Sequence, residues 1–170
     1  MRIISRRGFG VLIAASAALM VAAGGAVAAS TLRTGTTVAH TAVLTQDTAS
    51  THTGSAFTQL GSLSVNAGAG STILVTFSAE SACSGANGWC TARVLVDGTE
   101  ATPAVGTDFS FDSTNTNRET AESWESHSMQ RVATATTAGS HTVVLQVAQI
   151  GTNVTARYDD WTLTAMAIAP

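Results

Sequence analysis

The sequence contains no lysine. Its eight basic residues are all arginines, and they stand against eleven acidic residues, which gives a formal net charge of −3. Three of the arginines lie in the first seven residues, so the chain after residue 28 keeps five arginines against the eleven acids, a net charge of −6. An acidic surface without a basic run repels phosphate, which excludes nucleic acids and anionic membranes as expected partners.

Cysteine is scarce as well, with Cys83 and Cys90 as the only two. Their spacing differs from C-x-x-C and no further ligands accompany them, as a zinc site would require, so we expect a disulfide and not a metal or redox site. In the loop-entropy model, closing so short a ring stabilises the fold by about 2.5 kcal/mol. A structural disulfide is typical of an oxidising compartment.

The sequence also lacks a catalytic motif. It has no nucleophile elbow of the form G-x-S-x-G. One cluster has acid–base potential, and it comprises Glu119, Glu122, Glu125 and His127. On a strand, Glu125 and His127 would share a face about 7 Å apart. Glycosidases need two carboxylates facing each other across the substrate, and serine hydrolases need a base held by a third group. We therefore expect a non-catalytic protein without a cofactor.

The amino-terminal segment has the pattern of an export signal. After the first arginines comes a charge-free run over 8–29, which ends with the small-x-small triplet A-V-A at 26–28. The run is long enough to span a bilayer, but its Ala- and Gly-rich composition and the triplet favour a cleaved signal peptide over 1–28. The residues S-R-R-G-F at 5–9 resemble the core of twin-arginine signals, with the general export route as the alternative. We predict a secreted, extracellular protein with a flexible arm over 29–36.

Alternation of apolar and polar residues recurs between turn signals throughout 37–170, and no helical stripe is present. The stretch 71–98 shows this most clearly. It alternates over 73–79 and again over 92–96, with the cysteine-closed loop between, and it predicts a long hairpin clamped by the disulfide. Asp97-Gly98 then predicts a two-residue type I′ turn.

Eight to ten such strands predict an all-β fold, a two-sheet antiparallel β-sandwich, and we prefer a jelly roll to an immunoglobulin-like topology. The sequence is less clear about the burial of His40 and about the inward face of the strand over 122–134. His40 lies on the same side of its strand as the apolar positions, so we expect a partly buried, hydrogen-bonded histidine and not a ligand. In the strand over 122–134 neither face is cleanly apolar, and the sequence does not indicate which face points inward.

Three tryptophans are candidate binding residues: Trp89, Trp124 and Trp161. Trp89 lies inside the Gly-rich ring, where a rigid aromatic face could stack on a sugar or anchor a partner; alternatively, it folds back as a lid on the core. Trp161 follows Asp159 and Asp160.

These two carboxylates are candidate calcium ligands. Hard cations prefer several oxygen ligands, and Asp108, Asp112 or backbone carbonyls would complete the shell. The alternative is that Asp159 and Asp160 are simply solvated, with Arg157 paired to one of them.

Several segments carry a resemblance to known proteins. They are 74–80, the paired cysteines, 94–98, 124–129 and 159–164. Together they resemble a group of small secreted actinobacterial proteins of uncharacterised function, a likeness that covers most of the mature chain and implies no activity or site. The strand, clamped loop and V-D-G turn are also similar to the jelly rolls of C1q and tumour-necrosis-factor type, which implies a possible homotrimer.

Two functions from different classes follow as expectations. The first is a secreted binding module that recognises a glycan, a cell-wall polymer or a protein through exposed aromatic residues. The second is a structural, self-associating protein whose sandwich faces pack against each other.

Overall fold

The computed structural model describes residues 33–114 and 123–170. The predicted signal peptide and the residues Glu119 and Glu122 lie outside this part of the chain. The described residues form β-strands and no helix, which confirms the all-β prediction. The strands are β1 (Thr37–Gln46), β2 (Ser50–Thr53), β3 (Thr58–Ala67), β4 (Thr72–Val96), β5 (Thr99–Glu100), β6 (Asp112–Ser113), β7 (Glu125–Thr134) and β8 (Gly139–Ala169).

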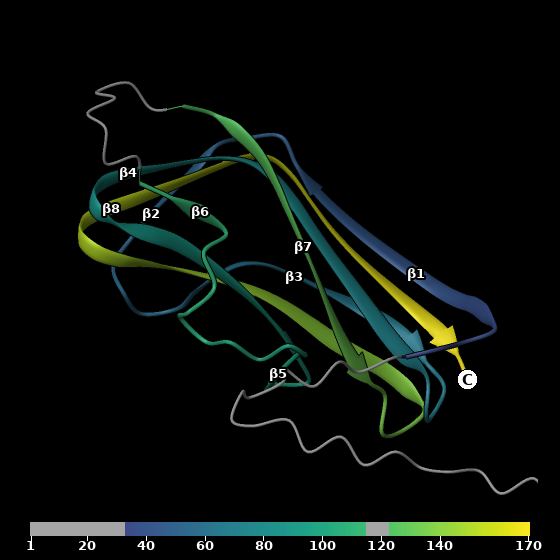
Figure 1. Cartoon of the computed structure of the whole chain (residues 1–170). Coiled ribbons are helices and arrows are strands. Elements are labelled where there is room, and N and C mark those ends of the chain that lie inside the picture. The colour runs from purple at the N-terminus through teal and green to yellow at the C-terminus, as the bar shows by residue number, and fades with distance from the viewer. Residues whose placement is uncertain (1–32, 115–122) are drawn as a thin grey trace, which may run out of the picture. The chain divides into compact units, whose positions relative to one another are not determined.

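Two very long strands run through both layers of the fold. β4 has 25 residues and β8 has 31, and they pair antiparallel from Thr72 opposite Ile168 to Val96 opposite Val143. The strands β1, β2 and β3 follow one another along the free edge of β8, and β7, β6 and β5 lie along the free edge of β4. This four-stranded ribbon bends over on itself, as Figure 1 shows.

The bend produces two sheets, ordered β1-β8-β4-β7 and β3-β8-β4-β5. All pairs are antiparallel, and this order is that of a jelly roll. The predicted two-sheet antiparallel β-sandwich is therefore confirmed.

The segment predicted as a hairpin is a single bent strand. Both of its limbs belong to β4 and pair with β8, and not with each other. The disulfide Cys83–Cys90 is confirmed, with a Cα–Cα distance of 5.9 Å, and it staples the bend within this strand. Gly85 (φ 131°) and Asn87 (φ 53°) supply the positive backbone angles, as they would in a reversal, but the chain uses them to turn from one sheet into the other.

The predicted turn at Asp97-Gly98 is confirmed. Both residues have positive φ, 51° and 80°, and Val96 pairs with Thr99 on either side of them. These angles belong to the type I′ hairpin, whose twist matches that of the flanking strands.

The core lies between the two sheets and follows the alternation in the sequence. Ile73, Val75 and Phe77 of one layer, and Val94 and Leu145 of the other, are fully or almost fully buried. Each such side chain stabilises the fold by roughly 1.5–3 kcal/mol on burial. The alternation therefore assigned the inward faces of these strands correctly.

The inward face of β7 is also settled. Met129 and Arg131 are buried and His127 is half-buried, whereas Ser128 and Gln130 are exposed. The guanidinium of Arg131 lies 4.4 Å from the ring centre of Phe109. The inner face of β7 thus carries the polar residues Glu125 and His127 at its start, followed by Met129 and Arg131.

The structure bears on two expectations about the first residues of the domain. His40 is exposed and not partly buried, because it lies on the edge strand β1, although it pairs with the buried Ala167. Residues 33–36 were predicted to belong to a flexible arm, yet the Thr36 backbone N–H donates to the Ala169 carbonyl at 3.0 Å. The Arg33 guanidinium also donates to the Thr134 hydroxyl at 2.6 Å.

Candidate functional site

An open, polar groove of about 480 Å³ lies beside the disulfide, where β4 bends. It is lined by Ser110, Phe111, Asp112, Ser113, Thr114, Glu125 and His127. Asp112 is carried there by β6, which pairs with β4 so that Asp112 stands opposite Cys90. Glu125 and His127 come from the polar start of β7, two residues apart on its inner face.

Three side chains of this groove converge. One ligand atom from each of Asp112, Glu125 and His127 lies within 4.8 Å of the others. Within this group, His127 Nε2 lies 3.7 Å from Glu125 Oε2. In the part of the chain that the structure describes, this is the one group of three or more His, Cys, Asp or Glu side chains placed to share a metal ion.

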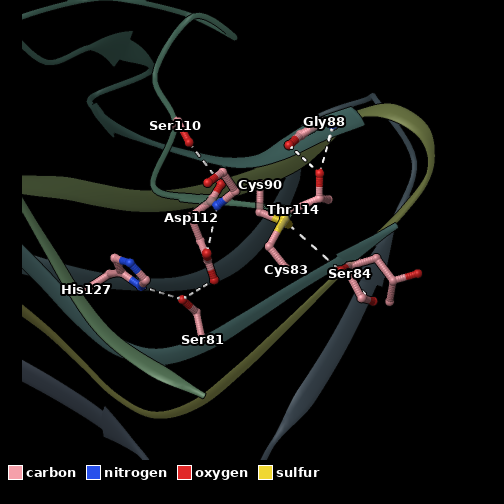
Figure 2. The surroundings of a disulfide bond; sticks show 11 residues. Ser81, Cys83, Ser84, Gly88, Cys90, Ser110, Asp112, Thr114 and His127 are labelled. Carbon is pink, nitrogen blue, oxygen red and sulfur yellow. Dashed lines mark hydrogen bonds between the residues drawn. A yellow bond between two sulfur atoms is a disulfide. The ribbon is translucent and has the colours of Figure 1, made fainter. Parts of the chain in front are cut away.

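Ser81 of β4 links two of these side chains. Its hydroxyl donates to Asp112 Oδ2 at 2.8 Å and lies 3.0 Å from His127 Nδ1, and Figure 2 shows it between them, next to the disulfide. Because the single hydroxyl proton goes to Asp112, Nδ1 of His127 carries a hydrogen and donates to the serine oxygen. In the neutral imidazole, Nε2 then has the free lone pair, on the side of Glu125.

The surroundings of the site are apolar on the inside and negatively charged at the groove. The Phe111 ring packs against His127 with 5.6 Å between centres and against Tyr158 with 6.1 Å. Burial raises the pKa of Tyr158 above its ordinary value of 10.0, and the negative charge of Asp112 adds to the shift. The charge of Asp112 therefore acts on the low-dielectric interior as well as on the groove.

Ser81, Asp112 and His127 do not have the hydrogen-bond order of a serine hydrolase. In such enzymes the serine donates to the histidine, which the acid holds from the other side. Here the serine is only 1% exposed and donates to the acid. This arrangement suits Ser81 as a positioning residue for His127 and leaves the expectation of a non-catalytic protein as a prediction.

The structure separates the three predicted tryptophans. Trp124 is 39% exposed, and it directly precedes Glu125 of the groove. One face of its ring carries the Arg157 guanidinium at 4.9 Å. Trp89 is half-buried, and its indole N–H donates to the Thr107 carbonyl at 2.8 Å, so it anchors the segment after β5.

Trp161 lies in the core, contrary to the prediction that it contributes to a binding surface. It is buried and packs edge-on against Phe77, with 6.4 Å between ring centres. Gly61 faces its ring so closely that a Cβ there would approach the Trp161 ring to 2.7 Å. Its alternation with Leu163 and Ala165, both buried, already indicated an inward position.

The four aspartates named for the predicted calcium shell do not form one group in the described part of the chain. Asp160 lies within β8, where the pairing with β4 shifts register; its φ is positive (43°), and its backbone N–H donates to the carboxylate of Asp159. Of the four aspartates proposed for the shell, Asp112 alone belongs to the group described above, and Asp108, Asp159 and Asp160 do not.

The sequence interpretation missed Ser81, which organises the site. A signal for it was present, because Ser81 continues the inward phase of Ile73, Val75 and Phe77 along β4. A polar residue in an apolar phase indicates a buried hydrogen bond, since an unpaired buried hydroxyl is costly.

The described residues include no helix long and apolar enough to cross a membrane. The disulfide is compatible with an extracellular location. No protein-family model matches the chain, and no curated protein has a detectably similar sequence.

Proposed function

We propose that the protein is a secreted, non-catalytic binding module that takes a neutral glycan in the groove beside the disulfide. The observation that carries the proposal is an open groove with hydroxyl, carboxylate and imidazole groups, next in sequence to Trp124, the exposed aromatic residue of the described chain. Sugars offer hydroxyls to such polar groups and apolar ring faces to an aromatic side chain.

The charge of the protein supports a neutral ligand. The groove contains two carboxylates, and the chain after residue 28 has more than twice as many acids as arginines. Anionic cell-wall polymers would be repelled by this field, whereas uncharged polysaccharides would not. A protein ligand would require a larger apolar contact surface than one tryptophan provides.

Binding of uncharged soluble polysaccharides by affinity electrophoresis and calorimetry tests this proposal. We expect Trp124→Ala to weaken binding about tenfold, a loss of about 1.4 kcal/mol, because an aromatic anchor is removed. Val43→Ala is the matched control, since Val43 is also an exposed apolar residue but lies on β1. Unchanged binding in both Trp124→Ala and Glu125→Gln would exclude this groove as the ligand site.

A second candidate, self-association, is favoured by the outer face of the β1-β8-β4-β7 sheet. Three rows of paired residues cross this face without a charged side chain. They are Val38–Ile168–Thr72–Thr134, Thr41–Met166–Leu74–Val132 and Val43–Thr164–Thr76–Gln130. Copies of an acidic protein repel each other, so an uncharged face is where they could meet.

Light scattering distinguishes this candidate. Self-association through this face predicts a multiple of the chain mass for the wild-type protein and a monomer for Val43→Asp. Ser62→Asp, on an exposed position of β3 in the other sheet, is the control that should keep the wild-type mass. A wild-type monomer at high concentration would rule out self-association.

A further inference from the structure

We infer that Asp112, Glu125 and His127 form a binding site for a divalent transition-metal ion, with Zn²⁺ as the preferred ion. This inference goes beyond glycan binding and does not depend on it. It starts from distance. Ligand atoms bound to one zinc ion at about 2.1 Å are separated by roughly 3.4 Å in a tetrahedral site. The 3.7 Å between His127 Nε2 and Glu125 Oε2 is close to this separation.

Little movement is needed to complete the site. The three ligand atoms already lie within 4.8 Å of one another, and the Glu125 side chain is 61% exposed, so it can rotate toward the ion. Asp112 is held more firmly, because its second carboxylate oxygen accepts the Ser113 backbone N–H at 2.7 Å. Asp112 is therefore the buried, fixed ligand, and Glu125 is the exposed, adjustable one.

His127 is oriented as metal-bound histidines are. Such histidines donate the N–H of the other ring nitrogen to a fixed acceptor, which sets the tautomer and the ring plane. Here the acceptor is the Ser81 oxygen, 3.0 Å from Nδ1. Ser81 is almost fully buried and also donates to Asp112, so one side chain positions two of the three ligands.

The donor set selects the kind of ion. One imidazole nitrogen with two carboxylates suits Zn²⁺, Mn²⁺ or Ni²⁺, whereas Ca²⁺ takes six to eight oxygen ligands. The ligand atoms of the two carboxylates lie within 4.8 Å of each other, so their negative charges repel. A divalent cation would neutralise both carboxylates, and the groove would leave a coordination position open to water or to a ligand oxygen.

Calorimetry on the secreted, chelator-treated protein tests the site with ZnCl₂ alone as the probe. We expect one zinc ion per chain, and an affinity at least tenfold lower in Glu125→Gln and in His127→Gln. The controls are His40→Gln, which removes an exposed histidine, and Asp159→Asn, which removes a carboxylate outside the group. Both controls should bind zinc as the wild type does.

Thermal unfolding provides a second readout that shows whether each variant is folded. Zinc at about 100 times its Kd should raise the Tm of the wild type by at least about 5 °C, and it should not raise that of Glu125→Gln. The inference is overturned if zinc neither binds nor stabilises, if His40→Gln abolishes binding, or if calcium binds more tightly than zinc. Because no glycan is present, each of these results leaves the proposed glycan binding to be decided separately.

Discussion

The histidines His141 and His127 lie at opposite ends of the sandwich, and their surroundings differ. His141, 3% exposed, has Nδ1 2.6 Å from Asp97 Oδ2 and Nε2 3.1 Å from the Thr137 carbonyl. His127, with 28% of its side chain exposed, has Ser81 on Nδ1 and the groove at Nε2. The first ring has both nitrogens hydrogen-bonded and no solvent access. The second has one nitrogen fixed and one available.

This difference in hydrogen bonding distinguishes a structural histidine from a candidate metal ligand. Both ring nitrogens of His141 have hydrogen-bond partners within the protein, and these contacts tie the strand β8 to the Asp97-Gly98 turn. His127 instead accepts nothing from Ser81 and keeps a lone pair for an external partner. We expect substitutions at the first histidine to change stability and those at the second to change binding.

The largest expected effect is at His141. His141→Ala should lower the free energy of unfolding by about 3 kcal/mol, because it removes two hydrogen bonds and the packing of a buried ring. His127→Ala should cost about 1 kcal/mol, since its ring is partly solvated. Urea unfolding measures both. Equal losses would mean that the two histidines do not differ as their contacts indicate.

Removing the disulfide should disturb the end of the sandwich that holds the zinc site more than the opposite end, where His141 lies. Cys83→Ser with Cys90→Ser should destabilise the protein by about 2.5 kcal/mol, through the lost loop constraint. Zinc affinity should fall as well, because Asp112 is placed opposite Cys90 by the β4–β6 pairing. Calorimetry and urea unfolding measure the two effects. Unchanged zinc affinity in a folded variant would show that the bend holds Asp112 without the disulfide.

Ser81→Ala keeps the three proposed zinc ligands and removes the hydroxyl group that contacts two of them, Asp112 and His127. We expect a stability loss of about 1.5 kcal/mol, from the lost hydrogen bonds to Asp112 and His127. Zinc affinity should fall about tenfold or more, as it does when the orienting partner of a metal-bound histidine is lost. Ser81→Thr, which keeps the hydroxyl, should recover part of the affinity. If Ser81→Ala binds zinc normally, the serine does not position the ring.

The smallest expected effect is the pH dependence at Asp97. Hydrogen bonds from the His141 ring and the Thr142 backbone N–H lower the pKa of Asp97 below its ordinary value of 3.8. A carboxyl whose pKa is lower in the folded state stabilises the protein above the unfolded pKa, and this contribution disappears as the pH falls through the folded pKa. The stability difference between the wild type and Asp97→Asn should therefore shrink below about pH 4. It is small because half of the Asp97 side chain is exposed.

Much of the fold could be predicted from local pattern. Alternation placed Ile73, Val75 and Phe77 inward, and the Asp97-Gly98 turn followed from its two residues alone. The course of β4 could not be predicted in this way, because Gly85 and Asn87 permit a bend as readily as a reversal. Which of the two occurs depends on pairing with β8, and residues such as Thr72 and Ile168 are far apart in the chain.

The candidate site was predictable only in part. Glu125 and His127 were identified as a pair, since they alternate on one strand. Asp112 and Ser81 are too far away in the sequence for a local motif to place them beside this pair. Ser81 is 31 residues from Asp112 and 46 from His127. Trp161, by contrast, is in phase with the buried Leu163 and Ala165, so its core position was readable from the sequence.

The passage of β4 and β8 through both layers has a consequence for how the molecule forms. The strands β4 and β8 are central to both sheets, so the hydrogen-bond pairing of one sheet cannot be completed before the other sheet has formed. Nucleation must bring together segments that are remote along the polypeptide, so we expect slow refolding, in the range of milliseconds to seconds, and a single cooperative transition. Amide exchange at the centres of β4 and β8 would then occur only through opening of the whole domain.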